Sequence, residues 1–288
     1  MFASEQTAKR LRRMLASIVV GDPVLALASS ALEWCRNFPG ADGSLTHFQR
    51  KSSVSPPPIA PAGNRLLDRL STSVRRRILA GCEPVELAFA DVLYTPGRRL
   101  THVYFPIRGF ISLVMPVGGA SSLEVGLIGN EGMFGIPLAL GLDMSPLRAV
   151  VQGAGSAWRM DAARFCRELK QSPALQGQID RYIFVHLGQL AQTAGCTRFH
   201  VVEARLARWL LMTQDRAQAD AFHITQQFLA LMLGVRRVGV TKAAGALQER
   251  KLIRYSRGNI TVLDRPGLRA ASCLCYAADR ETYDRALA

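Results

Sequence analysis

Basic side chains gather in one short segment near the C-terminal end of the chain. Arg236, Arg237, Thr241 and Lys242 lie on the outward side of a helix predicted over residues 236–249, opposite its apolar residues. An arginine can bind both acceptors of guanine in the major groove, and a lysine or threonine can reach a phosphate or a thymine methyl group. The spacing predicts a helix that reads double-stranded DNA; an ordinary amphipathic helix with a basic face is the alternative.

A second helix and a tight turn come just before this basic segment. Thr225 suits the N-cap of a helix that continues through Gln226 and Gln227. Gly234 is typical of a helix end, because glycine readily adopts a positive φ, and the apolar Val235 follows it. The expected inward-facing residues are Phe228, Leu229, Met232 and Leu233 in the first helix, and Val240, Ala243, Ala244 and Leu247 in the second. This order predicts a helix-turn-helix.

A β-hairpin is expected directly after the two helices. Residues 252–256 and 259–263 have strand-like composition, and Arg257-Gly258 between them forms a two-residue turn. A hairpin in this position makes the domain a winged helix and brings Arg254 and Arg257 alongside the phosphates. The formal net charge of +14 also favours a polyanionic partner. Together these features predict a protein that binds double-stranded DNA.

Other kinds of site find little support in the sequence. No Ser/His/Asp grouping, phosphate-cradling glycine loop or carboxylate pair marks a catalytic centre, so we expect no enzyme activity. The cysteines are scattered without Cys-x-x-Cys or zinc-type spacing, which predicts reduced thiols and no metal site. They are Cys35, Cys82, Cys166, Cys196, Cys273 and Cys275. Since no apolar run reaches ~18 residues, we expect a cytoplasmic protein without a membrane partner.

The region ahead of the helix-turn-helix combines a small sheet with a long helix. Short runs rich in β-branched and aromatic residues, separated by glycines, extend over residues 85–152 and predict an antiparallel sandwich or barrel. Asp161 is a good N-cap for one helix, and Pro173 opens a longer one. The longer helix carries an apolar seam that predicts self-association, with packing in its own core as the alternative. The seam residues are Ile179, Ile183, Leu187, Leu190 and Ala194.

These patterns divide the chain into four parts with an α+β fold. Residues 1–62 end in a proline-rich stretch and are expected to form a poorly packed extension and linker. Residues 63–172 begin with one or two short helices and are expected to form the β-rich domain. Residues 173–196 form the helix that pairs two copies, and residues 197–288 form the winged helix-turn-helix.

From residue 64 to residue 276 the chain resembles the Crp/Fnr family of bacterial transcription regulators. The most specific part is the sequence ITQQFLALMLGVRRVGVT at 224–241, followed by LQERKLI at 247–253. The resemblance implies a β-roll of cyclic-nucleotide-binding type, a long dimerisation helix and a C-terminal winged helix-turn-helix. It also implies a homodimer that binds double-stranded DNA and works with RNA polymerase. An arginine at the place of Arg237 reads guanine in the family, whereas Val238 replaces a glutamate, so the target sequence should differ.

The effector pocket implied by the resemblance departs from the family's cyclic AMP site. In that site a glutamate after Phe-Gly holds the ribose, and an arginine-serine pair holds the cyclic phosphate. This chain has Phe134, Gly135 and Ile136 at the first place, and Arg148 and Ala149 at the second. A ligand hydroxyl left unpaired in a pocket costs ~1–3 kcal/mol. We therefore expect no tight binding of cyclic AMP.

The remaining cofactor classes have weak support. Family members that sense oxygen hold an iron–sulfur cluster on closely spaced N-terminal cysteines, but Cys35 stands alone there, so no cluster is expected. The candidate haem ligands are His102 and His186, and neither has a partnering ligand pattern. The predicted function is a dimeric, sequence-specific transcription regulator with a diverged effector domain. The alternative is a small-molecule sensor whose basic helices dock a protein or a membrane instead of DNA.

Overall fold

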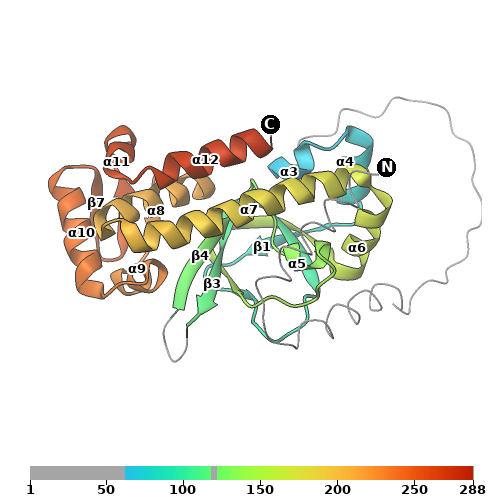
Figure 1. Ribbon diagram of the computed structural model, residues 1–288, viewed down its shortest axis with the longest axis horizontal. Coiled ribbons are helices and arrows are strands. Elements are labelled where there is room, and N and C mark those ends of the chain that lie inside the picture. The colour runs from blue at the N-terminus through green and yellow to red at the C-terminus, as the bar shows by residue number, and fades with distance from the viewer. Residues whose placement is uncertain (1–61, 118–121, 288) are drawn as a thin grey trace, which may run out of the picture. The chain divides into compact units, whose positions relative to one another are not determined.

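The computed structural model describes residues 62–117 and 122–287, and Figure 1 labels its elements. Apart from Ala62, the extension expected over residues 1–62 lies outside the described residues. The helices are α3 (Arg65–Asp68), α4 (Thr72–Leu79), α5 (Ile136–Ala139), α6 (Ala162–Gln171), α7 (Pro173–Phe199), α8 (Val202–Ala217), α9 (Gln226–Leu233), α10 (Arg237–Glu249), α11 (Arg265–Ala271) and α12 (Cys275–Ala286). The strands are β1 (Glu83–Leu87), β2 (Val92–Tyr94), β3 (His102–Pro116), β4 (Ser122–Ile128), β5 (Arg148–Asp161), β6 (Ala221–His223), β7 (Ile253–Ser256) and β8 (Asn259–Val262).

Two long antiparallel strands, β3 and β5, form the centre of the first sheet. The strand order is β1-β5-β3-β4, and β2 also pairs with β5. The prediction of shorter strands ending at glycines is wrong here, because Gly109, Gly153 and Gly155 lie inside β3 and β5. A Cβ atom at Gly109 or Gly155 would collide with the backbone of the opposite strand, and Gly109 has a φ of +75° where the register shifts. The glycines therefore allow the two bent strands to pair with their backbones very close together at the register shift.

A single asparagine fastens the first short helix to this sheet. The side chain of Asn64 accepts hydrogen bonds from the amides of Leu66 and Leu67 and so caps α3. Its amide group donates to the carbonyls of Pro106 and Gly132, at 2.9 Å in each case. The described chain is thus anchored to the β-roll from its first helix onward.

Helix α7 begins where the sequence predicts it and runs from the β-roll toward the C-terminal domain (Figure 1). Ser172 caps its first turn, and Pro173 occupies the first helical position, where the missing amide hydrogen has no intrahelical acceptor. The helix spans 27 residues and ends at Phe199. No helix within 62–117 and 122–287 combines the length and apolarity needed to cross a bilayer.

The exposed apolar line on α7 differs from the predicted seam. Ile179 is fully buried against its own chain and is not available to a second copy, which corrects the prediction at that position. Phe184, which the prediction omits, is 65% exposed, and Leu187 is 52% exposed. Phe184, Leu187, Ala191 and Ala194 are all exposed and step by 3, 4 and 3 residues. This spacing is typical of a helix that pairs along a narrow face.

The C-terminal part is a winged helix with additional elements around it. Helices α8, α9 and α10 share one buried core with a three-stranded sheet in the order β6-β8-β7. Strand β6 is too short to show in the sequence pattern, yet it completes this sheet by pairing with β8. After the hairpin the chain forms α11 and then α12, which packs against α7.

Candidate functional site

The predicted recognition helix presents its basic residues to solvent. Helix α10 buries Val240, Ala243, Ala244 and Leu247, the inward face expected from the sequence. Arg236 is the N-cap residue, and it is exposed together with Arg237, Val238, Thr241 and Lys242. Three exposed cations therefore lie at the N-cap and in the first two turns of α10. In known helix-turn-helix proteins, this N-terminal part of the helix reaches base edges.

The turn between α9 and α10 depends on Gly234. It has φ 61° and ψ 41°, a left-handed conformation that favours glycine. The amide of Val235 donates to the carbonyl of Ala230 at 2.9 Å, and the amide of Gly234 donates to that of Leu231 at 3.2 Å. These two bonds complete the end of α9 and turn the chain sharply into α10.

The hydroxyl of Thr241 is engaged inside the protein. It lies 2.9 Å from the side-chain oxygen of Gln226 and 3.1 Å from the carbonyl of Arg237, and it can donate to either. Gln226 comes directly after Thr225, whose side chain caps α9 by accepting from the amide of Phe228 at 3.2 Å. The predicted hydroxyl contact to DNA therefore competes with a bond that holds the two helices together. The methyl group of Thr241 takes no part in these bonds.

The wing carries its two arginines on the outside. Arg257 and Gly258 have φ values of 49° and 82°, which is the type I′ turn that suits the twist of a hairpin. Arg254 on β7 and Arg257 at the turn are both exposed. The hydroxyl of Tyr255 donates to the carbonyl of Ile224 at 2.8 Å, so the hairpin is tied to the segment that leads into α9.

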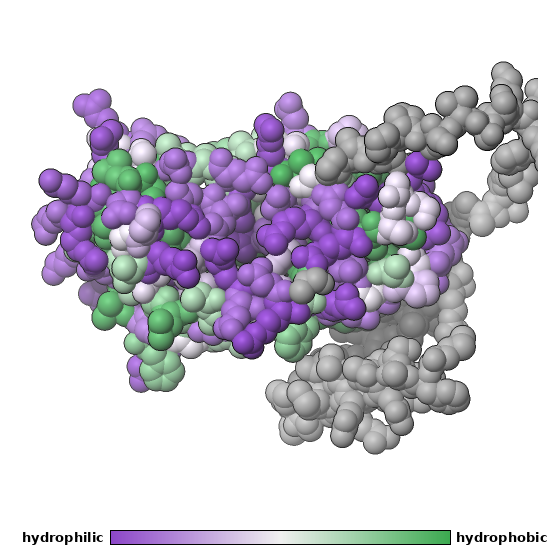
Figure 2. Space-filling view, turned by 90° about the horizontal axis from the view of Figure 1, so that it is seen from above, coloured by the Kyte–Doolittle hydropathy of each residue, from purple (hydrophilic) through white to green (hydrophobic). Residues whose placement is uncertain are grey.

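The surface around these elements is polar. Figure 2 shows mostly hydrophilic residues over the end of the molecule that carries the winged helix, with small apolar patches between them. Gln227, at the start of α9, is exposed near the same edge as Thr225. A surface of this kind, rich in arginine, suits a hydrated and negatively charged partner.

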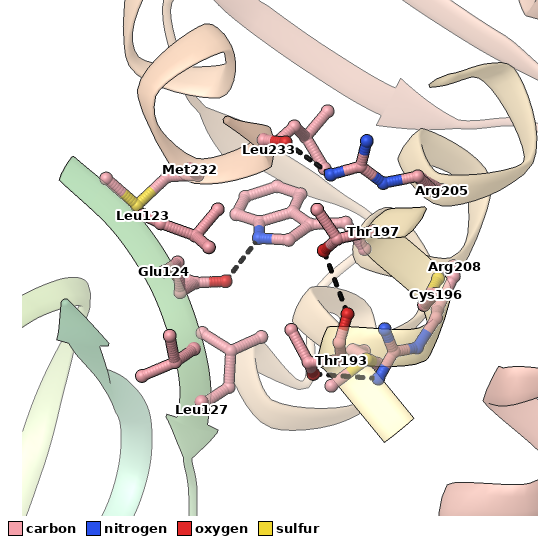
Figure 3. Close-up of a pocket in the computed structure, with 14 residues that line it drawn as sticks. Leu123, Glu124, Leu127, Thr193, Cys196, Thr197, Arg205, Arg208, Met232 and Leu233 are labelled. Atoms are coloured by element: carbon pink, nitrogen blue, oxygen red, sulfur yellow. Dashed lines mark hydrogen bonds between the residues drawn. The ribbon is translucent and has the colours of Figure 1, made fainter. Parts of the chain in front are cut away.

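A buried contact joins the β-roll to the helix-turn-helix, as Figure 3 shows. The indole nitrogen of Trp209 in α8 donates to a carboxylate oxygen of Glu124 in β4 at 2.7 Å. The hydroxyl of Ser112 in β3 donates to the other oxygen at 2.6 Å. A side chain at Gly234 would collide with Leu123, the neighbour of Glu124. Strand β4 is thus packed directly against α8 and against the turn that precedes α10.

The cavity beside this contact is small. Its volume is about 50 Å³, and it is lined by residues of β4, α7, α8 and α9. Typical ligand pockets hold roughly 300–1,000 Å³. This cavity is therefore a junction between packed elements and is too small for a nucleotide-sized ligand.

The environment of Glu124 favours its neutral form. Burial raises the pKa of this carboxyl from 4.5 to about 7, while hydrogen bonds from Ser112 and Trp209 and the charges of Arg216 and Arg208 act in the opposite direction. In the unfolded chain the group loses its proton near pH 4.5. Between pH 4.5 and about 7 the folded protein holds a proton that the unfolded chain lacks, so the free energy of unfolding falls as the pH rises through this window.

The variant Glu124→Gln should remove this pH dependence. A glutamine oxygen can still accept from Trp209, and its amide can donate to the hydroxyl of Ser112. Relative to the variant, the wild-type protein should lose about 2 kcal/mol of unfolding free energy between pH 5 and pH 7.5. Urea unfolding of both proteins at a series of pH values measures the difference, and parallel curves would contradict the expectation.

The residues predicted to line an effector pocket differ from one another in burial and in their neighbours. Phe134 is buried with its ring centre 5.9 Å from that of Tyr94 and 6.3 Å from that of Tyr104. Gly135 has a φ of +115° and precedes α5, which begins with the half-buried Ile136. At the start of β5, Arg148 is exposed and Ala149 is fully buried. An aromatic cluster therefore fills the interior beside Phe134, and the arginine remains accessible at the rim.

The two histidines considered for haem are also placed by the structure. His102 is the first residue of β3, and its ring nitrogen lies 3.0 Å from the hydroxyl of Thr101. His186 is buried on α7 beside the ring of Tyr182. Burial lowers the pKa of His186 to about 4, so this imidazole is neutral at physiological pH.

The prediction that the cysteines are scattered is wrong for three of them. Cys196, Cys273 and Cys275 come together with His200, and their potential ligand atoms all lie within 4.8 Å of one another. The sequence offered two weak signals, a Cys-x-x-x-His spacing at the end of α7 and a Cys-x-Cys pair before α12. The two pairs are more than 70 residues apart in sequence, and only folding brings them into one cluster.

The sequence matches one protein-family model, and the structure resembles several solved structures. Residues 204–271 match the family model of the Crp-like helix-turn-helix domain. A Crp/Fnr-family transcriptional regulator from Eubacterium rectale has a similar structure, with a TM-score of 0.57, 15% identity, and coverage of 72% of this chain and 96% of that one. The c-di-GMP-responsive regulator CLP from Xanthomonas campestris has a TM-score of 0.56 at 18% identity, with 67% and 99% covered. A Crp/Fnr regulator from Thermus thermophilus has a TM-score of 0.54 at 22% identity, with 66% and 98% covered.

A search of curated proteins finds no match to the chain. The three structural similarities establish the fold, a β-roll followed by a long helix and a C-terminal winged helix. The domain match over residues 204–271 covers α9, α10 and the hairpin, where the basic residues lie.

Proposed function

We propose that this chain is a transcription regulator of the Crp/Fnr family that binds double-stranded DNA sequence-specifically as a homodimer; the domain match over residues 204–271 and the shared fold support this. The observation that carries the proposal is the exposed basic edge at the start of α10. Arg236, Arg237 and Lys242 project from one helix that the hairpin and α9 hold in place. We further propose that it acts in the cytoplasm, together with RNA polymerase, and without enzyme activity.

In the proposed complex the start of α10 enters the major groove. Arg237 then binds the two acceptors of a guanine, while Arg236 and Lys242 contact nearby bases or phosphates. Val238 is 59% exposed and offers an apolar contact, suited to a thymine methyl group. Arg254 and Arg257 of the wing lie along the phosphates and add affinity without selecting a sequence.

The homodimer forms through the exposed line on α7 in this proposal. Phe184 and Leu187 supply large apolar side chains, and Ala191 and Ala194 allow two helices to approach closely. Two copies related by a twofold axis place their recognition helices in successive major grooves, about one helical turn apart. The operator should therefore be a palindrome.

Signals from the β-roll reach the DNA-binding helices through the junction at Glu124. Because β4 contacts both α8 and the turn before α10, a change in the β-roll that moves β4 changes the position of the recognition helix. Two positions of this kind with different DNA affinities are what a two-state regulator requires. The related Xanthomonas protein responds to c-di-GMP, so regulators of this fold are not restricted to cyclic AMP.

Cyclic AMP itself should bind weakly or not at all. Ile136 cannot accept a hydrogen bond from a ribose hydroxyl, and Ala149 cannot donate one to a phosphate. The aromatic rings of Tyr94, Tyr104 and Phe134 further reduce the space for a ligand. Titration calorimetry of the full-length protein should show no micromolar binding, and a dissociation constant of a few micromolar or tighter would contradict this.

Selection of DNA sequences by the full-length protein tests the proposed function. The protein is incubated with a randomised duplex library, and bound sequences are recovered over several rounds. We expect a palindromic consensus whose affinity drops steeply as salt increases, because phosphate contacts release counterions. Recovery of no consensus at any salt concentration would refute the proposal and favour the alternative, a sensor that docks a protein or a membrane.

A further inference from the structure

Four metal-binding side chains meet where the end of α7 lies beside the beginning of α12. Cys196 lies in the last turn of α7, and His200 is its C-cap residue. Cys273 precedes α12, and Cys275 is its first residue. We propose that these three thiols and one imidazole bind a single zinc ion. The inference goes beyond DNA recognition and stands independently of it.

The distances within the cluster fit a tetrahedral ion. With Zn–S bonds of about 2.3 Å and Zn–N bonds of about 2.0–2.1 Å, the edges of the tetrahedron are about 3.8 Å between two sulfurs and about 3.5 Å between sulfur and nitrogen. The sulfurs of Cys196 and Cys273 are 3.5 Å apart. The sulfur of Cys275 lies 3.4 Å from Nδ1 of His200. Only small side-chain shifts are therefore needed to place an ion between all four.

Polar side chains next to the cluster contact its ligands. The side-chain amide of Gln192 donates to the sulfur of Cys275 at 2.8 Å. A zinc ion with three thiolates carries one net negative charge, and Arg208, which pairs with Asp279 at 2.5 Å, also interacts with Cys196. Such outer contacts orient ligands and raise metal affinity.

The donor set identifies the metal and its role. Three thiolates with one imidazole, arranged around one point, are typical of four-coordinate zinc. The three cysteines are 2%, 8% and 2% exposed, while His200 lies at the surface, and four protein ligands leave no open position, as in structural zinc sites. The ion would clamp the end of α7 to the segment between α11 and α12. It would thereby fix the long helix to the domain that carries α10.

Metal content and cobalt spectroscopy of the full-length protein test the site. Protein purified under reducing conditions should contain about one zinc per chain. After removal of zinc, titration with Co²⁺ should produce the charge-transfer absorption of cobalt–thiolate bonds and the visible bands of a tetrahedral ion, saturating at about one equivalent. This measurement uses the wild-type chain and does not depend on how any variant folds.

Variants then identify the ligands. Cys273→Ser and Cys275→Ser should each weaken zinc binding by more than the roughly 10–100-fold that is typical for loss of an outer contact. Gln192→Ala removes such an outer contact and should fall within that range. Cys82→Ser is the matched control, because Cys82 lies at the end of α4, away from the cluster, and it should bind zinc as the wild type does.

Three results would overturn the assignment. The first is a reduced wild-type protein that neither retains zinc nor takes up Co²⁺. The second is zinc binding that is equally tight in Cys273→Ser and in the Cys82→Ser control. The third is a Cys196–Cys273 disulfide in the protein isolated from cells, detected by mass spectrometry, since that bond would consume two of the four ligands.

Discussion

Arg237→Ala is expected to weaken binding to the selected operator by about 5- to 150-fold, the equivalent of ~1–3 kcal/mol, and to relax preference at one base position in each half-site. The reason is that alanine cannot make the two-pronged contact to guanine that the proposed complex assigns to Arg237. Arg237 is exposed and caps nothing, so the fold should be unchanged. Fluorescence anisotropy with the operator and with single-base variants measures both effects.

Arg257→Ala provides the matched control for that experiment. Arg257 is also an exposed arginine, but it lies at the tip of the hairpin. Its loss should weaken binding to all sequences about equally and reduce the slope of log affinity against log salt by about one. If Arg237→Ala behaved in the same way, with base preference intact, α10 would not be the element that reads the sequence.

Phe184→Asp should convert the protein from a dimer to a monomer. Two copies paired along α7 would bring Phe184 near its symmetry mate, and a buried unpaired carboxylate there costs several kcal/mol. Affinity for the palindromic operator should fall by at least about 100-fold, because the two half-sites would no longer be bound by one linked molecule. Analytical ultracentrifugation gives the mass, and anisotropy gives the affinity.

Phe89→Asp controls for the change of an exposed aromatic residue to a charge. Phe89 is 52% exposed, close to the 65% of Phe184, but it lies in the turn after β1. This variant should remain dimeric and bind the operator normally. A dimeric Phe184→Asp protein would show that α7 does not form the interface.

The helix-turn-helix could be predicted residue by residue because its signals are local. A capping threonine, a glycine at the turn and apolar residues at helical spacing all lie within 25 consecutive residues, and Thr225, Gly234 and Val240 take the positions that the pattern indicates. The hairpin is local in the same sense, since Arg257-Gly258 specifies its own turn. Where chain neighbours determine the structure, the sequence is sufficient.

The face of α7 was harder to predict, because a helix between two partners has apolar residues on both sides. Ile179 and Phe184 are both apolar residues of the same helix, but the first is fully buried and the second is exposed. Periodicity alone does not say which stripe contacts the protein's own core. That choice is made by tertiary packing.

Contacts between distant segments could not be predicted at all. Glu124 and Trp209 are 85 residues apart, and nothing near either one signals the hydrogen bond between them. The same holds for Cys196 and Cys273, which are separated by 77 residues. The length of strands β3 and β5 was also difficult to predict. Their glycines resemble turn signals in the sequence, and only the structure shows that they lie where the two paired backbones approach closely.

The hydrogen bond from Trp209 to Glu124 affects how the protein unfolds. A fragment that began at α8 would expose an indole that is now 5% accessible, and the complementary fragment would leave the buried Glu124 with only one of its two donors. The N-terminal and C-terminal halves are therefore expected to melt in a single cooperative transition, with neither persisting as an autonomous folding unit. Heat would then abolish operator affinity and effector response at the same temperature.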